Sequence, residues 1–198
     1  MAEALAHGLD VTGCDPLYGG DPETITAQGK VDIDACRAQI ARNPGVLVYN
    51  DVEAFYRDKY AALERFAEDF RKRRHDGRYV AGALPSLPFE DRSFDMVLTA
   101  NFLMVYAPLK DGGMHAGQDF GLAFHLRSVE ELARVTKYEM RIPGVHTWKQ
   151  PPEKHPYCRP MMDRLAELGF AVELVQSQYD DGCSATTPAC NQVLVARR

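Results

Sequence analysis

Short apolar runs alternate with amphipathic helical patterns along most of this chain, and that alternation restricts the possible folds more than any other feature. Strands that a sheet buries on both faces have this uniformly apolar character. The predicted strands lie at 10–14, 79–81, 94–99, 139–142, 171–176 and 192–196. Because helical patterns fall between several of them, we expect an α/β fold with a doubly wound, mostly parallel sheet.

Three segments between these runs predict helices. The pattern at 52–74 is the strongest, since its aromatic and aliphatic residues recur at spacings of three and four. Two shorter patterns follow at 126–137 and 159–168, and Gly169 ends the second of them. Each of these helices should bury one apolar face.

Two segments interrupt the alternation. Residues 17–51 are rich in Gly, Pro, Asp and Thr near their start and predict one short helix, at about 35–42. Residues 107–124 are glycine-rich and weakly patterned. Long irregular loops in a compact domain are usually functional or disordered. We expect a single domain over 1–198, with an insertion at 17–77 that contains the long helix.

The charge of the chain limits its partners. Its 198 residues carry a net charge of −5, which argues against nucleic acid or an anionic membrane held by bulk charge. The basic run at 71–74 ends a predicted helix, where cations complement the helix dipole. A phosphate-binding patch is the alternative interpretation of that run.

The cysteines and the apolar segments indicate the compartment. Five widely spaced cysteines are an odd number, which fits reduced thiols better than a disulfide framework. No stretch approaches the ~20 apolar residues of a membrane span. The first residues also lack the basic-then-apolar pattern of a signal peptide. We therefore expect a cytoplasmic protein with neither nucleic-acid nor membrane partners.

The most specific motif is RYVAGALPSLPFEDRSFDMVLTANFL, at 78–103. A strand there runs into Leu-Pro-Phe at 87–89 and an acidic loop, and then Ser-Phe-Asp at 93–95 begins the next strand. In this order the elements resemble the middle of a class I S-adenosylmethionine-dependent methyltransferase, of the methyltransferase type 11-like kind. HLRSVEELARVTKYEMRI, MMDRLAELGFAVELV and NQVLVARR resemble the helices and strands that follow in that family. The resemblance covers most of 9–16 and 78–198.

This resemblance implies a Rossmann-like sheet and a site for the cofactor S-adenosylmethionine. Asp15, which closes a strand, matches the acidic residue that accepts hydrogen bonds from both ribose hydroxyls. Pro16 and Leu17 would then lie against one face of the adenine. An Asp that closes a strand before Pro is also a common turn former, which is the alternative for Asp15.

Four further residues match cofactor positions of the family. Ala83 and Leu84 match the turn that reads the adenine edge. Many relatives have Asp at the first of these positions, and Ala83 cannot replace it, so the backbone N–H of Leu84 is the remaining reader. Asn101 and Phe102 follow the fourth strand of the family, where the methionine end of the cofactor and the methyl acceptor meet.

Four histidines of the second half, at 115, 125, 146 and 155, are candidates for catalytic or metal-binding residues. A histidine after the fourth strand of the family can act as the general base that deprotonates a methyl acceptor. His125 is the candidate because it begins a helix beside the expected cofactor, and a helix-capping or pocket-lining histidine is the alternative. The His-x-x-Cys pattern at 155–158 lacks the tight set of four ligands of a zinc site, so no metal is predicted.

The sequence departs from the family at its beginning. The family's first strand leads into an acidic residue and a Gly-x-Gly-x-Gly turn, whose glycines let the backbone approach the cofactor. Gly8 and Gly13 have neither the spacing nor the context of that turn. Residues 1–8, MAEALAHG, resemble the end of the helix that follows it. The first strand and the glycine turn are therefore expected to be missing, through a misplaced start or a truncated gene.

The function implied by the resemblance is methyl transfer. An acceptor atom attacks the sulfonium methyl group in line, and the protein supplies alignment and a dry pocket. The acidic composition and the loop-rich segments favour a small-molecule acceptor over a nucleic acid. The alternative is a non-catalytic binding or regulatory protein that no longer binds the cofactor, which the missing glycine turn and Ala83 favour.

Overall fold

A computed structural model of the chain describes residues 2–42, 51–99, 102–117, 119–149, 152–177 and 191–198, apart from the side chains of 39 and 40. The helices are α1 (Ala2–Ala6), α2 (Pro22–Arg42), α3 (Val52–Arg73), α4 (Leu122–Val135) and α5 (Cys158–Glu167), with 3-10 turns η1 (Pro16–Gly19) and η2 (Leu109–Asp111). The strands are β1 (Gly13–Cys14), β2 (Tyr79–Val80), β3 (Phe94–Leu98), β4 (Thr136–Pro143), β5 (Ala171–Gln176) and β6 (Gln192–Arg197).

The described residues form two compact units, and each is treated by itself. Unit 1 holds the residues up to Ala83, and unit 2 holds those from Leu84 onward. Unit 1 contains a two-stranded sheet of β1 and β2, and unit 2 contains a four-stranded sheet in the order β3-β4-β6-β5. The structure is thus mixed α/β, as predicted, while the single domain over 1–198 stays a prediction.

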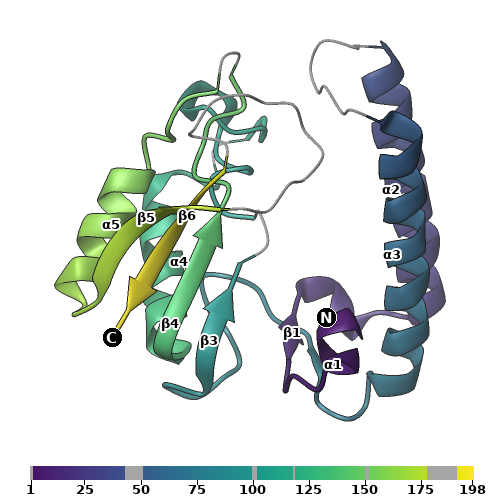
Figure 1. The fold of residues 1–198 in the computed structure, drawn as a ribbon, viewed down its shortest axis with the longest axis horizontal. Helices are drawn as coiled ribbons and strands as arrows, with labels where there is room; N and C mark the ends of the chain where they lie inside the picture. The colour runs from purple at the N-terminus through teal and green to yellow at the C-terminus, as the bar shows by residue number, and fades with distance from the viewer. Residues whose placement is uncertain (1, 43–50, 100–101, 118, 150–151, 178–190) are drawn as a thin grey trace. The chain divides into compact units, whose positions relative to one another are not determined.

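In unit 1, α2 and α3 lie along one another as a helical hairpin (Figure 1). Asp51 caps the start of α3, because its Oδ1 accepts the N–H of Ala54 at 2.8 Å. The two helices approach closely at Gly29, where a Cβ atom would lie 2.8 Å from Cδ1 of Leu63. The predicted long helix is confirmed, and it ends one residue earlier than expected.

The length of α2 differs from the prediction of one short helix at about 35–42. α2 begins at Pro22 instead. Asp21 explains this start, because its Oδ2 accepts the N–H of Thr24 at 2.9 Å in the first turn. Of the α2 residues whose burial is described, only Pro22 and Thr26 are buried. The helix therefore lacks the continuous apolar stripe that marks an amphipathic helix in a sequence.

The first strands of unit 1 are present but shorter than predicted. β1 and β2 pair in parallel, with Gly13 beside Tyr79 and Cys14 beside Val80. The predicted runs at 10–14 and 79–81 each contribute only two residues to this sheet. α1 confirms that the beginning of the chain is helical rather than a strand.

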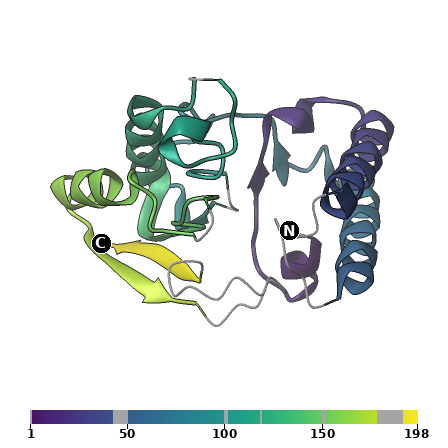
Figure 2. The ribbon, with the colours of Figure 1, turned by 90° about the horizontal axis from the view of Figure 1, so that it is seen from above.

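In unit 2, β3, β4 and β5 run in one direction and β6 runs against them. The prediction of a mostly parallel sheet is therefore confirmed. α4 and α5 pack against the same side of this sheet (Figures 1 and 2). The core between the helices and the sheet includes Val129, Leu132, Met140, Ile142, Met161, Leu165, Leu194 and Ala196.

The opposite face of the same sheet is partly open. Met96 and Leu98 of β3 are 52% and 64% exposed, so the prediction of strands buried on both faces is wrong for β3. Glu139 of β4 accepts hydrogen bonds at 2.6 Å from both Arg141 and Arg197, which forms a row of charges across this face. Among the described residues of unit 2 the helices pack on one side, and double winding stays a prediction.

The segment between β3 and α4, predicted as irregular, is held by its own backbone. The N–H of Met114 donates to the carbonyl of Val105 at 2.7 Å, and that of His115 donates to Ala107 at 3.1 Å. Gly113 lies inside this turn, where a Cβ atom would stand only 2.1 Å from the Ala107 carbonyl oxygen. Since that neighbour is backbone, any side chain at 113 would have to displace the turn itself.

We expect Gly113→Ala to lower the free energy of unfolding by about 3 kcal/mol or more, since the turn must open to admit the methyl group. Gly169→Ala is the control, because Gly169 has a φ of +88° and nothing within 4 Å of its Cβ position. That change should cost about 1–2 kcal/mol, from its left-handed backbone alone. Urea unfolding measures both, and equal losses would show that the close approach at 113 does not matter.

Candidate functional site

Asp15 lies where the sequence predicts it, directly after β1. Its backbone N–H donates to the carbonyl of Val80 at 3.2 Å, which continues the parallel pairing with β2 by one residue. Its carboxylate Oδ1 accepts the N–H of Leu17 at 2.8 Å and so caps η1. The second carboxylate oxygen has no hydrogen-bond partner in the described part of the chain. Asp15 is therefore a turn former and also keeps capacity to bind a ligand.

An aromatic cluster fixes the turn that Asp15 begins. The ring of Tyr18, in η1, stacks on Phe66 at 6.0 Å, is tilted against Phe70 at 5.5 Å and meets Tyr79 edge-on at 5.0 Å, measured between ring centroids. The Tyr79 hydroxyl in turn donates to a carboxylate of α3. Burial and the nearby carboxylate of Asp15 raise the pKa of Tyr18 to about 12. The loop after β1 is thus anchored to α3 and β2, and the Asp15 carboxylate is held in place.

The other unit 1 candidates lie near this turn. Pro16 and Leu17 are exposed, and Leu17 keeps 60% of its surface in contact with solvent. The N–H of Gly82 donates to the carbonyl of Asp15 at 3.4 Å, so the chain after β2 passes beside the chain after β1. Ala83 follows as the last residue of unit 1 and is exposed. The structure therefore brings 15–17 and 81–83 to one end of this small sheet.

The remaining cofactor candidates belong to unit 2 or are not described. Leu84 is partly buried and packs against the hydrophobic core. Phe102 packs against that core too, with its ring 5.8 Å from Phe120 and 6.1 Å from Phe124 between centroids. Asn101 lies outside the described residues. Leu84 and Phe102 thus line the same core, but their roles toward a cofactor stay predictions.

His125, the candidate general base, already uses both of its ring nitrogens. Nε2 accepts the N–H of Met104 at 3.0 Å, and Nδ1 lies 3.0 Å from the carbonyl of Gly121, to which it donates. The side chain is only 1% exposed, and burial lowers its pKa. This geometry favours the alternative of a helix-capping histidine, since His125 bonds the carbonyl of the residue before α4 and also holds the loop after β3 through Met104.

His155 is a second buried histidine, and the sequence did not predict its polar contacts. His155 is 1% exposed, and its Nδ1 accepts the N–H of Tyr157 at 3.1 Å. The proton of the neutral ring must then sit on Nε2, which is buried without a hydrogen-bond partner in the described residues. The Tyr157 hydroxyl donates to Asp111 at 2.6 Å, and burial, followed by this hydrogen bond, raises the pKa of Tyr157. The only signal in the sequence was a His-x-x-Cys spacing.

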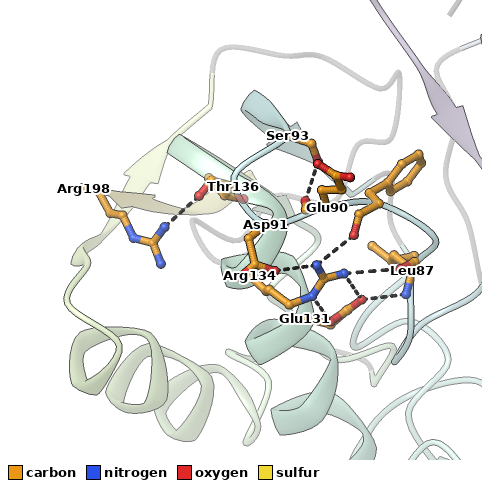
Figure 3. A network of polar contacts seen from close by, with 9 residues as sticks. Leu87, Glu90, Asp91, Ser93, Glu131, Arg134, Thr136 and Arg198 are labelled. Atoms are coloured by element: carbon orange, nitrogen blue, oxygen red, sulfur yellow. Dashed lines mark hydrogen bonds and ion pairs between the residues drawn. The ribbon is translucent and has the colours of Figure 1, made fainter.

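A cluster around the Arg134 guanidinium, the Arg134 cluster, was also not predicted (Figure 3). Nη1 donates to the carbonyl of Phe89 and to the carboxylate of Asp91, both at 2.8 Å. Glu131 accepts two bonds from Arg134, at 2.7 and 2.8 Å, and one from the N–H of Leu87 at 2.6 Å. The loop at 87–91 and the helix residues Glu131 and Arg134, which are far apart in the sequence, are therefore bonded directly to each other.

Other charged and sulfur groups have ordinary surroundings. Residues of the basic run pair with carboxylates in Arg71–Glu23, Lys72–Glu68 and Arg73–Asp69, which favours the helix-end interpretation of that run. The described cysteines, Cys14, Cys36 and Cys158, are free thiols. No group of three His, Cys, Asp or Glu side chains in the described residues is placed to hold a metal ion. None of the described helices is long and apolar enough to cross a membrane.

Comparison of the chain with family models, with curated proteins and with solved structures finds no match in any of the three. A function for this chain therefore has to be argued from its own residues, from the strand order of each unit and from the resemblance of its motifs.

His155 should make stability depend on pH. Burial is the main cause that lowers its pKa to about 4; His125, His146 and Lys149 lower it further, and Asp111 opposes them. The unfolded ring has an ordinary pKa of about 6.5. The neutral ring therefore costs no stability above pH 6.5, and as the pH drops toward 4 the free energy of unfolding falls by about 3 kcal/mol through His155.

We expect His155→Asn to remove most of that fall, because the Asn carbonyl can accept the Tyr157 N–H but does not titrate. Urea unfolding at pH 7 and pH 4.5 measures the difference for each protein. The exposed His75→Asn should lose as much stability as the wild type between the two pH values. A wild-type loss that His155→Asn leaves unchanged would contradict the assignment.

Proposed function

We propose that this chain is a methyltransferase-like protein that binds S-adenosylmethionine and transfers its methyl group to a small molecule. The observation that carries the proposal is Asp15. Its carboxylate stands at the carboxyl end of a parallel strand, where α/β sheets place their ligands. One carboxylate oxygen has no hydrogen bond in the described part of the chain, and the other accepts a single bond, from the N–H of Leu17. Such a carboxylate can accept bonds from ribose hydroxyls.

The strand order within each unit supports the proposal. In unit 1 the strand that leads to Asp15 pairs in parallel with the strand that leads to Ala83. In unit 2 the last strand, β6, inserts between β4 and β5 and is antiparallel to both. A closing strand of this kind, in a hairpin with the strand before it, is what the resemblance implies for NQVLVARR. A Rossmann-like sheet of the methyltransferase type is therefore part of the proposal.

The residues of the chain would act mainly by binding and alignment. S-adenosylmethionine supplies an electrophilic methyl group, so the protein needs to form no covalent bond with the substrate. Asp15 would orient the ribose, and the exposed Pro16 and Leu17 would contact the adenine. His125 has no free nitrogen for base catalysis in this arrangement. An acceptor that needs little help with proton removal fits this site best.

A non-catalytic binding or regulatory protein is the second candidate. One feature of the sequence favours it: Ala83 stands where many relatives have a carboxylate that reads the adenine amine. Its methyl group cannot hold that part of the cofactor. We therefore expect weak binding, which is best measured by saturation-transfer NMR with S-adenosylmethionine as the probe.

Asp15→Ala should reduce the affinity for S-adenosylmethionine at least about tenfold, since each charge-assisted bond to ribose is worth about 1.5–3 kcal/mol. The same change should lower the free energy of unfolding by about 1 kcal/mol, because the carboxylate caps η1. Asp15→Asn keeps an acceptor for the Leu17 N–H, so it should lose affinity while it retains most of the stability.

Asp51→Asn is the matched control, because Asp51 also caps a helical turn with a 2.8 Å bond from a backbone N–H. It should leave the binding of S-adenosylmethionine unchanged. Equal binding by Asp15→Ala and the wild type would return Asp15 to the role of a turn former. A wild-type protein that shows no saturation transfer to the ligand would favour the non-catalytic candidate.

A further inference from the structure

The Arg134 cluster joins α4 to the loop that leads into β3, and its contacts reach backbone as well as side chains. Glu131 accepts the N–H of Leu87 at 2.6 Å. Arg134 donates to the carbonyl of Phe89 at 2.8 Å and to that of Leu87 at 3.3 Å. The backbone carbonyl of Arg134 accepts the N–H of Arg92 at 2.8 Å. The loop is therefore fixed along its length from a single turn of α4.

The two charged residues of the helix need each other in this arrangement. The hydrogen bonds from Arg134 are the main cause that lowers the pKa of Glu131. Glu131 and Asp91 in turn raise the pKa of Arg134. The Glu131 side chain keeps 13% of its surface exposed and that of Arg134 keeps 32%. Only a planar guanidinium presents enough donors to reach two carbonyls and two carboxylates at once.

We infer that Glu131 and Arg134 are positioning residues, which hold segment 84–92 so that the backbone N–H of Leu84 stands ready for an adenine edge. The adenine part of this inference rests on the proposed function. Leu84 packs against the hydrophobic core, and Leu87, three residues later, is bonded at both its N–H and its carbonyl. The short chain between these two anchors has little freedom to move.

A purely structural ion pair would behave differently. Exposed pairs contribute little to stability on their own, and their loss would leave a distant backbone N–H unchanged. A positioning role instead predicts that the loop alone loosens and that ligand affinity falls with it. Hydrogen exchange of individual amides, read together with adenosine binding, separates these two roles.

The helix itself provides the control for this experiment. Glu130 is the neighbour of Glu131 on α4, and its carboxylate is paired with Arg164 of α5 at 2.7 Å. Glu130→Gln therefore weakens one carboxylate–arginine pair on the same helix turn, but it touches no residue of segment 84–92. The four variants to compare with the wild type are Glu131→Ala, Glu131→Gln, Arg134→Lys and Glu130→Gln.

In Glu131→Ala we expect the Leu87 amide to exchange at least about tenfold faster, because local opening no longer breaks a hydrogen bond. Amides of β4, such as that of Met140, should keep their wild-type rates. Glu131→Gln retains an acceptor and should recover most of the protection at Leu87. Arg134→Lys should loosen the loop as Glu131→Ala does, since an ammonium cannot reach both carbonyls.

Adenosine, followed by saturation-transfer NMR, is the ligand probe. We expect its affinity to fall at least about fivefold in Glu131→Ala and Arg134→Lys, about 1 kcal/mol on the usual scale, and to remain unchanged in Glu130→Gln. Unaltered exchange at Leu87 in both variants would overturn the positioning role. Loosened exchange with full adenosine affinity would overturn the link to Leu84. A wild type that does not bind adenosine, in which the exchange pattern still holds, would refute the proposed function and leave the positioning of the segment standing.

Discussion

The guanidinium of Arg134 fixes the loop that leads into β3 to the last turn of α4. It lies where α4 ends, where β4 begins one residue after the helix, and beside the loop that leads into β3. Parallel strands such as β3 and β4 cannot be joined by a tight turn, so their register relies on contacts made by the connecting segments. The cluster supplies such a contact near the start of the pairing, where Phe94 lies opposite Thr136. A loop, a helix and two strands therefore share one polar centre.

The loops at the carboxyl ends of β3 and β4 have a different character. They contain buried polar groups that lack a partner in the described residues, among them Nε2 of His155 and Nε1 of Trp148. A buried donor without an acceptor costs about 1–3 kcal/mol. These loops also bond to each other, through the Trp148 N–H to the Gly112 carbonyl and through Tyr157 to Asp111. The loops at the carboxyl ends of β3 and β4 therefore keep some hydrogen-bonding capacity, at the edge where α/β sheets usually bind ligands.

Local patterns predicted the elements well, and contacts between distant residues were the part that they could not predict. β5 matches its predicted range of 171–176, because its apolar residues and its flanking breakers are all local signals. The predicted length of α2 was too short because the two-helix hairpin buries few of its residues, so the helix has no continuous apolar stripe. The exposed β3 residues were missed because burial depends on which neighbours cover a face. Glu131 and Arg134 were seen as part of a motif, but only the fold shows that they bond to the loop at 87–89.

The polar candidates Asp15 and His125 differ in whether the fold already uses all of their hydrogen-bonding atoms. The position of His125 in the sequence suggested a general base. Both of its ring nitrogens, however, are hydrogen-bonded, to Met104 and to Gly121, so neither is free to take up a substrate proton. By sequence Asp15 matches the ribose-binding position of the family, although an Asp before Pro commonly only forms a turn. In the structure it forms that turn with one oxygen and leaves the other unbonded in the described residues. A residue that stabilises its own loop with part of its capacity and keeps the rest can bind a ligand without first breaking a contact of the fold. By that criterion Asp15 is the better candidate for the proposed site, and His125 contributes to the scaffold.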